Sequence, residues 1–160
     1  MNLFIKSNDG RYIPALIEEV IREAKTYQIA EQEVMSSPMA IAPTLAKKIG
    51  KKKIEHFVAV FLDNANHIIG FKTMNKGIEN QAAVYPKEVA RVALAKRASA
   101  VIVSHNHPGG VLTPSLADKS ITKAIKDCLE VFQIRFLDHI IVGNDGGLRY
   151  FSFQEQGEMP

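Results

Sequence analysis

The chain has 160 residues, of which 46% are hydrophobic and 23% are charged, a balance typical of a single compact globular domain. Its one cysteine, Cys128, excludes an intrachain disulfide and a cysteine-rich zinc site, and it favours a reducing, cytoplasmic location. The net charge of +3 is lower than that of most dedicated nucleic-acid-binding domains. Neither a signal-peptide pattern nor an apolar run of membrane-spanning length is found, so we expect no membrane association.

The N-terminal part of the sequence has the periodicity of helices. Apolar residues in 14–33 fall on one helical face, with a proline in the first turn, where it is tolerated. A second helix is predicted to begin after Ser37, as its cap, and to end at Gly50. We therefore expect an N-terminal helical extension over residues 1–35 and the main domain over residues 36–160.

The remaining sequence alternates between strand and helix patterns. The predicted elements are a hairpin of Val58–Leu62 and His67–Thr73, a short strand near Ala82–Val84, a helix from Pro86 to Arg97, a buried strand over Ala98–Ser104, a helix from Ser115 to about Val131, and two strands within 136–143 and 148–153 that an N-D-G-G turn joins. This order predicts an α/β fold in which helices cover the faces of a mixed sheet.

Residues 104–118, S-H-N-H-P-G-G-V-L-T-P-S-L-A-D, contain a candidate zinc site. Side chains two residues apart in an extended segment point the same way, so His105 and His107 converge while Asn106 points elsewhere. Asp118, in the first turn of the following helix, faces back toward the same loop. Three ligands leave the fourth position of one tetrahedral Zn²⁺ ion free for water, as in catalytic zinc sites, and zinc lowers the pKa of bound water to about 7.

Each half of this pattern also has a purely structural explanation. A lone H-x-H occurs by chance, and S-x-x-D before an apolar helix is usually a capping box, here formed by Ser115 and Asp118. The two halves are joined by a short loop rich in glycine and proline that follows a buried strand. This combination favours metal binding.

The spacing H-x-H, seven residues, S, two residues, D resembles the JAMM motif of the MPN metallopeptidases. The surrounding sequence is similar to the RadC family in particular, in the segments I-E-H-F-V-A-V-F-L-D-N-A-N, V-Y-P-K-E-V, S-H-N-H-P, T-P-S-L-A-D, L-D-H-I-I-V-G and Y-F-S-F-Q-E-Q-G. The resemblance covers residues 36–157 and implies a cytidine-deaminase-like three-layer α/β/α sandwich around a mixed sheet. The chain departs from the family at Gly109–Gly110, where Ser-Gly is usual, and residues 1–35 do not fit the helix-hairpin-helix of longer RadC proteins.

The resemblance also implies a zinc-dependent hydrolase in which activated water attacks an amide or isopeptide bond. Glu55, at the start of a predicted strand, corresponds to the JAMM general base, which takes a proton and passes it to the leaving amine. Ser115 would orient the scissile carbonyl or stabilise the oxyanion. Glu88 is the rival base, although acidic residues are common in the first turn of a helix because of the helix dipole.

Two other functions remain open at this point. A DNA-associated accessory role would use the five lysines of residues 47–53 to bind phosphate groups. Such a run of lysines is otherwise typical of a solvated helix end. A protein-interaction domain would keep the zinc site without catalysis. A peptide or protein substrate is the expected partner, and exposed edge strands make a homodimer plausible. His139 has two possible roles: a hydrogen-bonded histidine of the core, or a residue that hydrogen-bonds one of the metal ligands.

Overall fold

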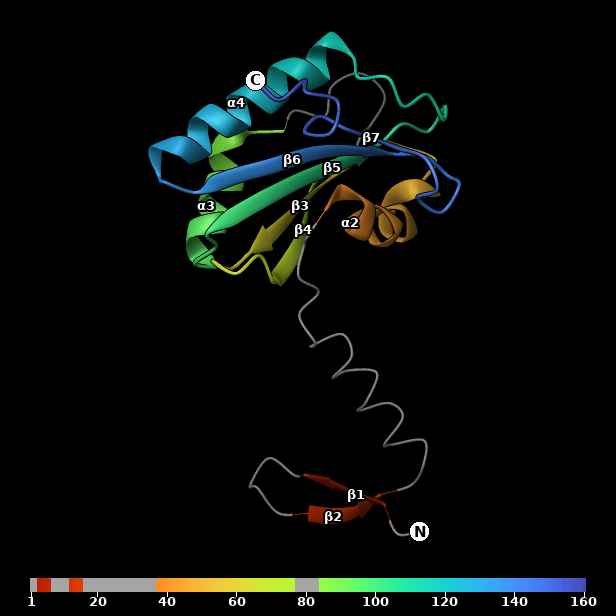
Figure 1. Ribbon diagram of the computed structural model, residues 1–160, viewed down its shortest axis with the longest axis vertical. Coiled ribbons are helices and arrows are strands. Elements are labelled where there is room, and N and C mark those ends of the chain that lie inside the picture. The colour runs from red at the N-terminus through yellow and green to blue at the C-terminus, as the bar shows by residue number, and fades with distance from the viewer. Residues whose placement is uncertain (1–2, 7–11, 16–36, 77–83) are drawn as a thin grey trace. The chain divides into compact units, whose positions relative to one another are not determined.

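The computed structural model describes residues 3–6, 12–15, 37–76 and 84–160. The chain divides into two units, Met1–Glu33 and Val34–Pro160 (Figure 1). Within the described ranges, no helix combines the length and the apolar composition needed to span a bilayer.

The first unit contains a two-stranded antiparallel sheet. Strands β1 (Leu3–Lys6) and β2 (Tyr12–Ala15) pair with each other along their whole length. The predicted start of a helix at residue 14 is therefore wrong, because Pro14 lies within β2, where the edge position tolerates a residue without an N–H group. The rest of that predicted helix, residues 16–33, lies outside the described residues.

One mixed sheet forms the centre of the second unit. Its strands are β3 (His56–Leu62), β4 (Ile68–Lys76), β5 (Ala100–Asn106), β6 (Arg135–Val142) and β7 (Tyr150–Ser152). They are arranged in the order β4-β3-β5-β6-β7. Only β5 and β6 are parallel, and every other neighbouring pair is antiparallel. The predicted mixed sheet is confirmed.

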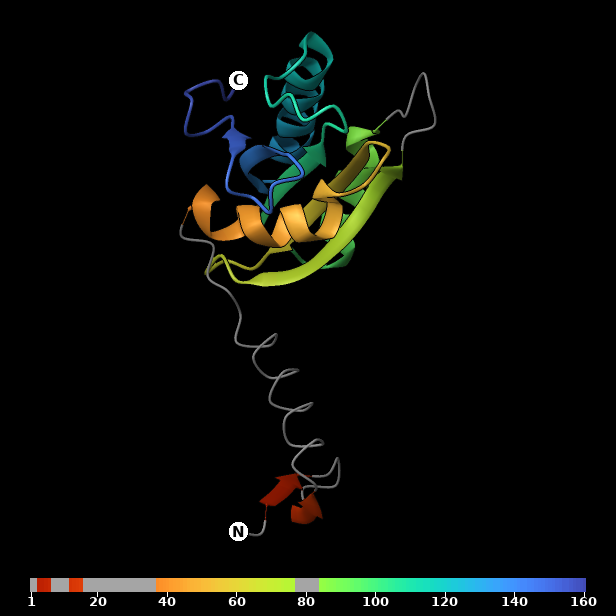
Figure 2. The same cartoon turned by 90° about the vertical axis from the view of Figure 1, so that its right-hand side faces the viewer.

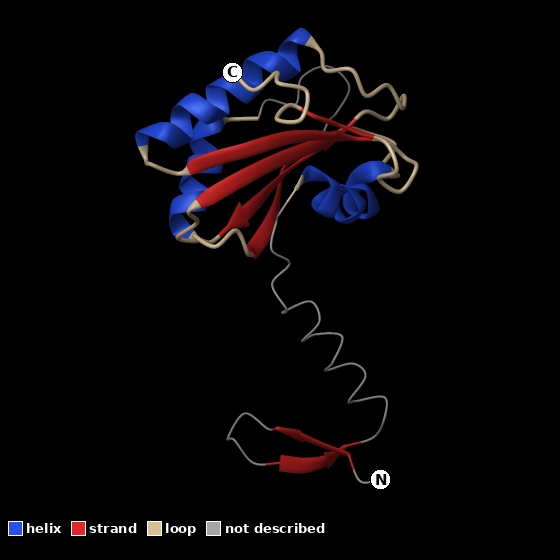
Figure 3. Ribbon diagram, viewed as in Figure 1, coloured by secondary structure: helices blue, strands red, loops and turns tan. Residues whose placement is uncertain are grey.

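Helices cover both faces of this sheet (Figures 2 and 3). On one face lies α2 (Pro38–Leu45), which continues into the π-helical turn η1 (Ala46–Gly50). On the other face lie α3 (Pro86–Ala95) and α4 (Leu116–Val131). The second unit is therefore the three-layer α/β/α sandwich that the resemblance implied.

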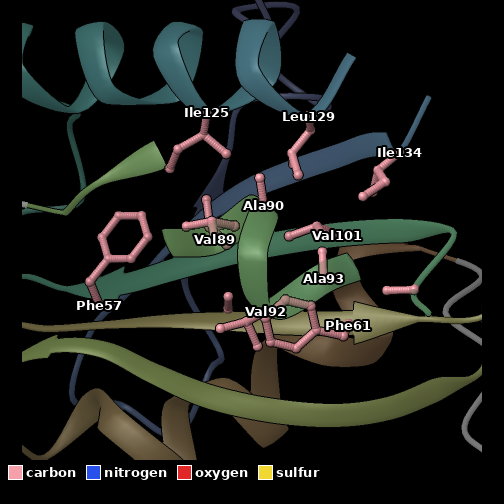
Figure 4. Packing of buried hydrophobic residues seen from close by; sticks show 13 residues of the cluster. Phe57, Phe61, Val89, Ala90, Val92, Ala93, Val101, Ile125, Leu129 and Ile134 are labelled. Carbon is pink, nitrogen blue, oxygen red and sulfur yellow. The ribbon is translucent and has the colours of Figure 1, made fainter. Parts of the chain in front are cut away.

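The two core clusters explain why the central strands are apolar throughout. Strands β3 and β5 are buried at every position, because helices cover both of their sides. Toward α3 and α4, the cluster includes Phe57, Phe61, Val101, Ile125 and Leu129 (Figure 4). Toward α2 and η1, it includes Ile41, Leu45, Val58, Val60 and Ile102.

Some predicted boundaries are shifted. The helix predicted over residues 86–97 ends at Ala95, and Arg97 adopts a left-handed conformation with φ of 54° that stops it. Strand β5 consequently begins at Ala100 and runs on through Asn106, so His105 lies inside the strand rather than beyond its end. Near the predicted strand at residues 82–84, only Val84 is described, and it is not in a strand.

Helix α2 and η1 begin and end where the sequence predicts, but for different physical reasons. Ser37 occupies the N-cap position, yet its side chain makes no capping hydrogen bond, so Pro38 at the first position sets the start. At Gly50, a Cβ atom would lie 2.3 Å from the carbonyl oxygen of Gly143. The close approach of η1 to the loop after β6 therefore requires glycine at this position.

Candidate metal centre

Strand β5 carries the first histidine into the interior of the domain. His105 lies opposite Phe57 of β3 and Ile141 of β6 in the sheet register. Its side chain is fully buried and stacks on the Phe57 ring, with the ring centroids 6.0 Å apart and the planes within 5°. His107 follows the last residue of the strand and keeps 20% of its side chain exposed. The two imidazoles therefore extend from the core to the surface.

Helix α4 supplies a carboxylate to the same place. Ser115 and Asp118 form a capping box: the Ser115 Oγ accepts the Asp118 N–H at 3.1 Å, and Asp118 Oδ2 accepts the Ser115 N–H at 2.7 Å. The Ser115 hydroxyl also donates to Asp118 Oδ2, at 2.7 Å. The capping explanation is thus correct, and the same box fixes the Asp118 carboxylate in one orientation.

The three predicted ligands converge on one point. The Nε2 atoms of His105 and His107 are 2.9 Å apart. Asp118 Oδ1 lies 3.2 Å from the first of these nitrogens, and Asp118 Oδ2 lies 3.4 Å from the second. Ligands at about 2.0–2.1 Å from a tetrahedral ion are separated by about 3.3 Å. His105, His107 and Asp118 could therefore hold a single metal ion.

A buried chain of hydrogen bonds fixes the tautomer of His105. The Thr122 hydroxyl lies 2.5 Å from the Asp118 carbonyl oxygen, and it must donate there because a carbonyl only accepts. The hydroxyl oxygen, 2.6 Å from His139 Nδ1, then accepts from that nitrogen. His139 Nε2 is left as an acceptor for the His105 Nδ1–H, at 2.8 Å. The assigned network therefore leaves a lone pair on His105 Nε2.

A second hydrogen bond fixes His107 in the same tautomer. Its Nδ1–H donates to the carbonyl oxygen of Val111, at 2.6 Å, which leaves a lone pair on Nε2. Two lone pairs and a carboxylate then face one another across about the width of a single ion. Such a set of donors repels itself unless a cation lies between them, so the chemistry of the site fits a bound divalent metal.

Burial keeps the inner imidazoles neutral. Desolvation lowers the pKa of His105 to about 4, although the nearby Asp118 opposes this shift. Burial also lowers the pKa of His139 well below its usual value. Neutral imidazole is the form that binds metals, so His105 is in the required state at neutral pH, and a neutral His139 can accept the His105 Nδ1–H.

His107 should control the pH dependence of metal binding. A protonated His107 would donate its Nε2–H to Asp118, and this favourable interaction raises the pKa of His107 although partial burial opposes it. A protonated His107 cannot bind zinc, so zinc affinity should fall about tenfold per pH unit below that raised pKa and level off above it. Competition with a chelating dye between pH 5 and 8 measures the profile. An affinity that stays constant across this range would contradict the assignment of His107.

Thr122 and His139 should support metal binding without touching the ion. Replacing Thr122 with valine removes the hydroxyl that sets the tautomers of His139 and His105. We expect zinc affinity to fall about 10- to 100-fold, as when other hydrogen-bond partners of metal ligands are lost. Thr122→Ser keeps the hydroxyl and should bind zinc nearly as well as the unmodified protein. Equal zinc affinity in the valine and serine variants would exclude this role for the hydroxyl.

The structure separates the two candidate bases. Glu55 precedes β3; partial desolvation is the main cause of its raised pKa, and the charge of Asp118 adds to the shift while that of His107 opposes it. Glu88 instead pairs with Arg91 at 2.9 Å, and its pKa is lowered by Arg91 first and then by lysines. Of these two glutamates, Glu55 is the one whose carboxyl interacts electrostatically with Asp118 and His107.

The sequence did not predict the role of Thr122, and it left two interpretations of His139. Thr122 lies four residues after Asp118, on the same face of α4, but nothing in its pattern distinguishes it from an ordinary core threonine. His139 is both a fully buried, hydrogen-bonded histidine and a partner of His105, so its two interpretations hold together. The lysines of residues 47–53 are all exposed, which fits a solvated helix end and does not by itself indicate a ligand.

The fold and the site together define an α/β domain of the JAB/MPN class with a candidate metal-binding triad. The sequence matches the model of the RadC-like JAB domain over residues 35–158. The chain belongs to this family.

Several curated proteins are similar to this chain. It is 38% identical over 143 residues to a UPF0758 protein of Methylibium petroleiphilum, covering 89% of this chain and 63% of the relative. It is 39% identical over 127 residues to a UPF0758 protein of Burkholderia cenocepacia, covering 79% and 49%. With a UPF0758 protein of Histophilus somni, identity is 44% over 122 residues, covering 76% and 54%. The chain thus spans about half to three-fifths of the length of these relatives.

Proposed function

We propose that this protein is a zinc-dependent hydrolase of the JAMM metallopeptidase type, which cleaves an amide or isopeptide bond in a peptide or protein. The observation that carries the proposal is the convergence of two imidazole lone pairs and one carboxylate within 2.9–3.4 Å of one another. Three protein ligands of this kind leave one tetrahedral position free, as catalytic zinc sites do. His107 keeps 20% of its side chain exposed, so the triad reaches the surface of the protein.

The donor set favours zinc over the other common divalent ions. Two imidazole nitrogens and one carboxylate oxygen at tetrahedral separations are typical zinc ligands, whereas Mg²⁺ and Ca²⁺ require six or more oxygen ligands. When bound, zinc acts as a Lewis acid that polarises a carbonyl and lowers the pKa of water. His105, His107 and Asp118 would hold it.

The proton transfers are assigned to Glu55. As water adds to the carbonyl carbon, the Glu55 carboxylate takes one of its protons, and it returns that proton to the amine nitrogen as the carbon–nitrogen bond breaks. Burial raises the pKa of Glu55, which makes its carboxylate a better proton acceptor than an ordinary exposed glutamate. One residue can therefore serve both halves of the reaction.

Ser115 is assigned to the carbonyl oxygen. Its hydroxyl donates to Asp118 Oδ2, and turning this proton toward a substrate carbonyl would supply an oxyanion donor. The Ser115 N–H remains bound to the same carboxylate oxygen, so Asp118 keeps its orientation while the hydroxyl turns.

A peptidase screen paired with elemental analysis tests this proposal. Protein purified without chelator should contain about one zinc per chain and should hydrolyse a subset of peptide or isopeptide substrates. Chelation should abolish that hydrolysis, and added zinc should restore it. A zinc-loaded protein that cleaves no amide substrate would contradict the hydrolase assignment and favour a non-catalytic role.

A further inference from the structure

Asn106 lies between the two candidate ligand histidines, and its side chain is completely buried. Its Oδ1 accepts the backbone N–H of His56, at 2.8 Å. Its Nδ2 donates to the carbonyl oxygens of Lys52, at 3.2 Å, and Ile54, at 3.3 Å. All three bonds span about fifty residues of sequence, so this amide ties the end of β5 to the segment that leads into β3.

These bonds hold the backbone on both sides of Glu55. The Ile54 carbonyl belongs to the peptide unit before Glu55, and the His56 N–H belongs to the peptide unit after it. Because peptide units are planar, the orientations of these two units define the φ and ψ angles of Glu55. A single side chain therefore restrains both backbone dihedrals of the residue.

The segment held in this way has little regular structure of its own. Residues 51–55 lie between η1 and β3 and belong to neither a helix nor a strand. The His56 ring adds one local contact, from Nδ1 to the Ile54 carbonyl oxygen, at 3.0 Å. The other restraints named here come from Asn106, which is itself part of the strand that carries His105.

We propose that Asn106 is a positioning residue that sets the place of the Glu55 carboxylate relative to the metal ligands. This inference rests on the proposed function, in which Glu55 is the general base. Because one strand carries both the ligand His105 and the amide that holds Glu55, the base and the metal site move together. Misplacement of a reacting group by about 1 Å can reduce the rate about 100-fold, so such a link has a direct effect on turnover.

Only an amide of this length provides the required groups. At position 106 the structure needs one acceptor for the His56 N–H and two N–H donors for the carbonyl oxygens of Lys52 and Ile54. The side-chain amide of asparagine provides both. Aspartate has the same shape and keeps the acceptor, but it has no donor and would face two carbonyl oxygens. Alanine loses all three bonds.

Two variants and a matched control test the proposal. The variants are Asn106→Asp and Asn106→Ala. The control is Ser104→Ala, because Ser104 is also fully buried on β5 and its hydroxyl has no hydrogen-bond partner in the described part of the chain. For each zinc-loaded protein, the measurements are zinc per chain, kcat and KM on a substrate from the screen, and hydrogen exchange at the His56 amide.

We expect both Asn106 variants to lose about 10- to 100-fold in kcat, while KM and the zinc content stay within about twofold. The Ser104 variant should match the unmodified protein. Exchange at the His56 amide should accelerate in Asn106→Ala. In a Glu55→Gln background, Asn106→Ala should cause no further loss, because its effect acts through Glu55. A purely structural role would instead produce additive losses or lost zinc.

The outcomes also separate this inference from the proposed function. If the unmodified protein hydrolyses no substrate, the hydrolase assignment fails, and His56 exchange alone then decides whether Asn106 holds the segment. Unchanged exchange in Asn106→Ala, or normal kcat in Asn106→Asp, would overturn the positioning role. If Asn106→Ala does not fold, the isosteric Asn106→Asp variant still gives this answer.

Discussion

Glu55→Gln is expected to reduce amide hydrolysis to a small residual rate while leaving one zinc bound per chain. Glutamine has the shape of glutamate but cannot accept the proton of the attacking water, and loss of a general base typically reduces rates about 10²- to 10⁴-fold. Zinc binding should persist, because the candidate ligand triad consists of His105, His107 and Asp118. Steady-state kinetics and elemental analysis of the same preparation measure both properties.

Glu88→Gln is the matched control for this experiment. Glu88 is a partly exposed residue of α3 whose ion-pair partner is Arg91, so its replacement should leave kcat and zinc content unchanged. An inactive, zinc-loaded Glu88→Gln beside an active Glu55→Gln would transfer the role of base to Glu88 and would contradict the electrostatic argument.

Asp118→Ala is expected to lose zinc altogether under conditions that saturate the unmodified protein. Removing a direct ligand should cost more than the about 10- to 100-fold that follows from losing an outer-shell partner. The same change removes half of the capping box of α4, so a parallel loss of stability of about 1 kcal/mol is expected. Zinc titration and thermal unfolding of the metal-free protein measure these two effects separately.

Asp118→Asn distinguishes the ligand from the cap. Asparagine keeps an oxygen that can accept the Ser115 N–H, so the metal-free stability should stay close to normal, while the loss of charge still weakens zinc binding. His105→Ala should also lose zinc, and it leaves the capping box intact. Normal zinc affinity in any of these three variants would show that the ion is not held by this triad.

The sequence contained enough to predict the main features of the site. The extended H-x-H spacing correctly placed His105 and His107 on one side of the chain, and S-L-A-D correctly placed Asp118 in the first turn of a helix. The helix cap is observed, and it is compatible with a ligand role, because both would use the same carboxylate. A capping box fixes its aspartate, and a fixed carboxylate is what a metal site requires.

The supporting residues could not be predicted, because they depend on strand register. His139 reaches His105 only because β5 and β6 are parallel with Val103 opposite His139, and no local pattern encodes a pairing between segments more than thirty residues apart. Asn106 was expected only to point away from the histidines. What it contacts there depends on how β3 lies beside β5.

The N-terminal strands were missed for a different reason. Helical periodicity in residues 14–33 favours a helix that begins with Pro14, although Asp9–Gly10 between two short apolar runs is a turn signal. The structure pairs Leu3 with Ala15 and Lys6 with Tyr12 in antiparallel strands. Apolar periodicity alone does not mark where the strand pattern ends and the helical pattern begins.

The most direct test of the metal centre is X-ray absorption spectroscopy at the zinc edge, on protein purified without chelator and loaded with one equivalent of zinc. Two imidazole nitrogens and a carboxylate oxygen should appear at about 2.0–2.2 Å, together with one further light ligand, and the imidazole signal should be lost in His105→Ala. A spectrum of fully hydrated zinc, or protein that retains no zinc after loading at neutral pH, would contradict a metal ion held by His105, His107 and Asp118.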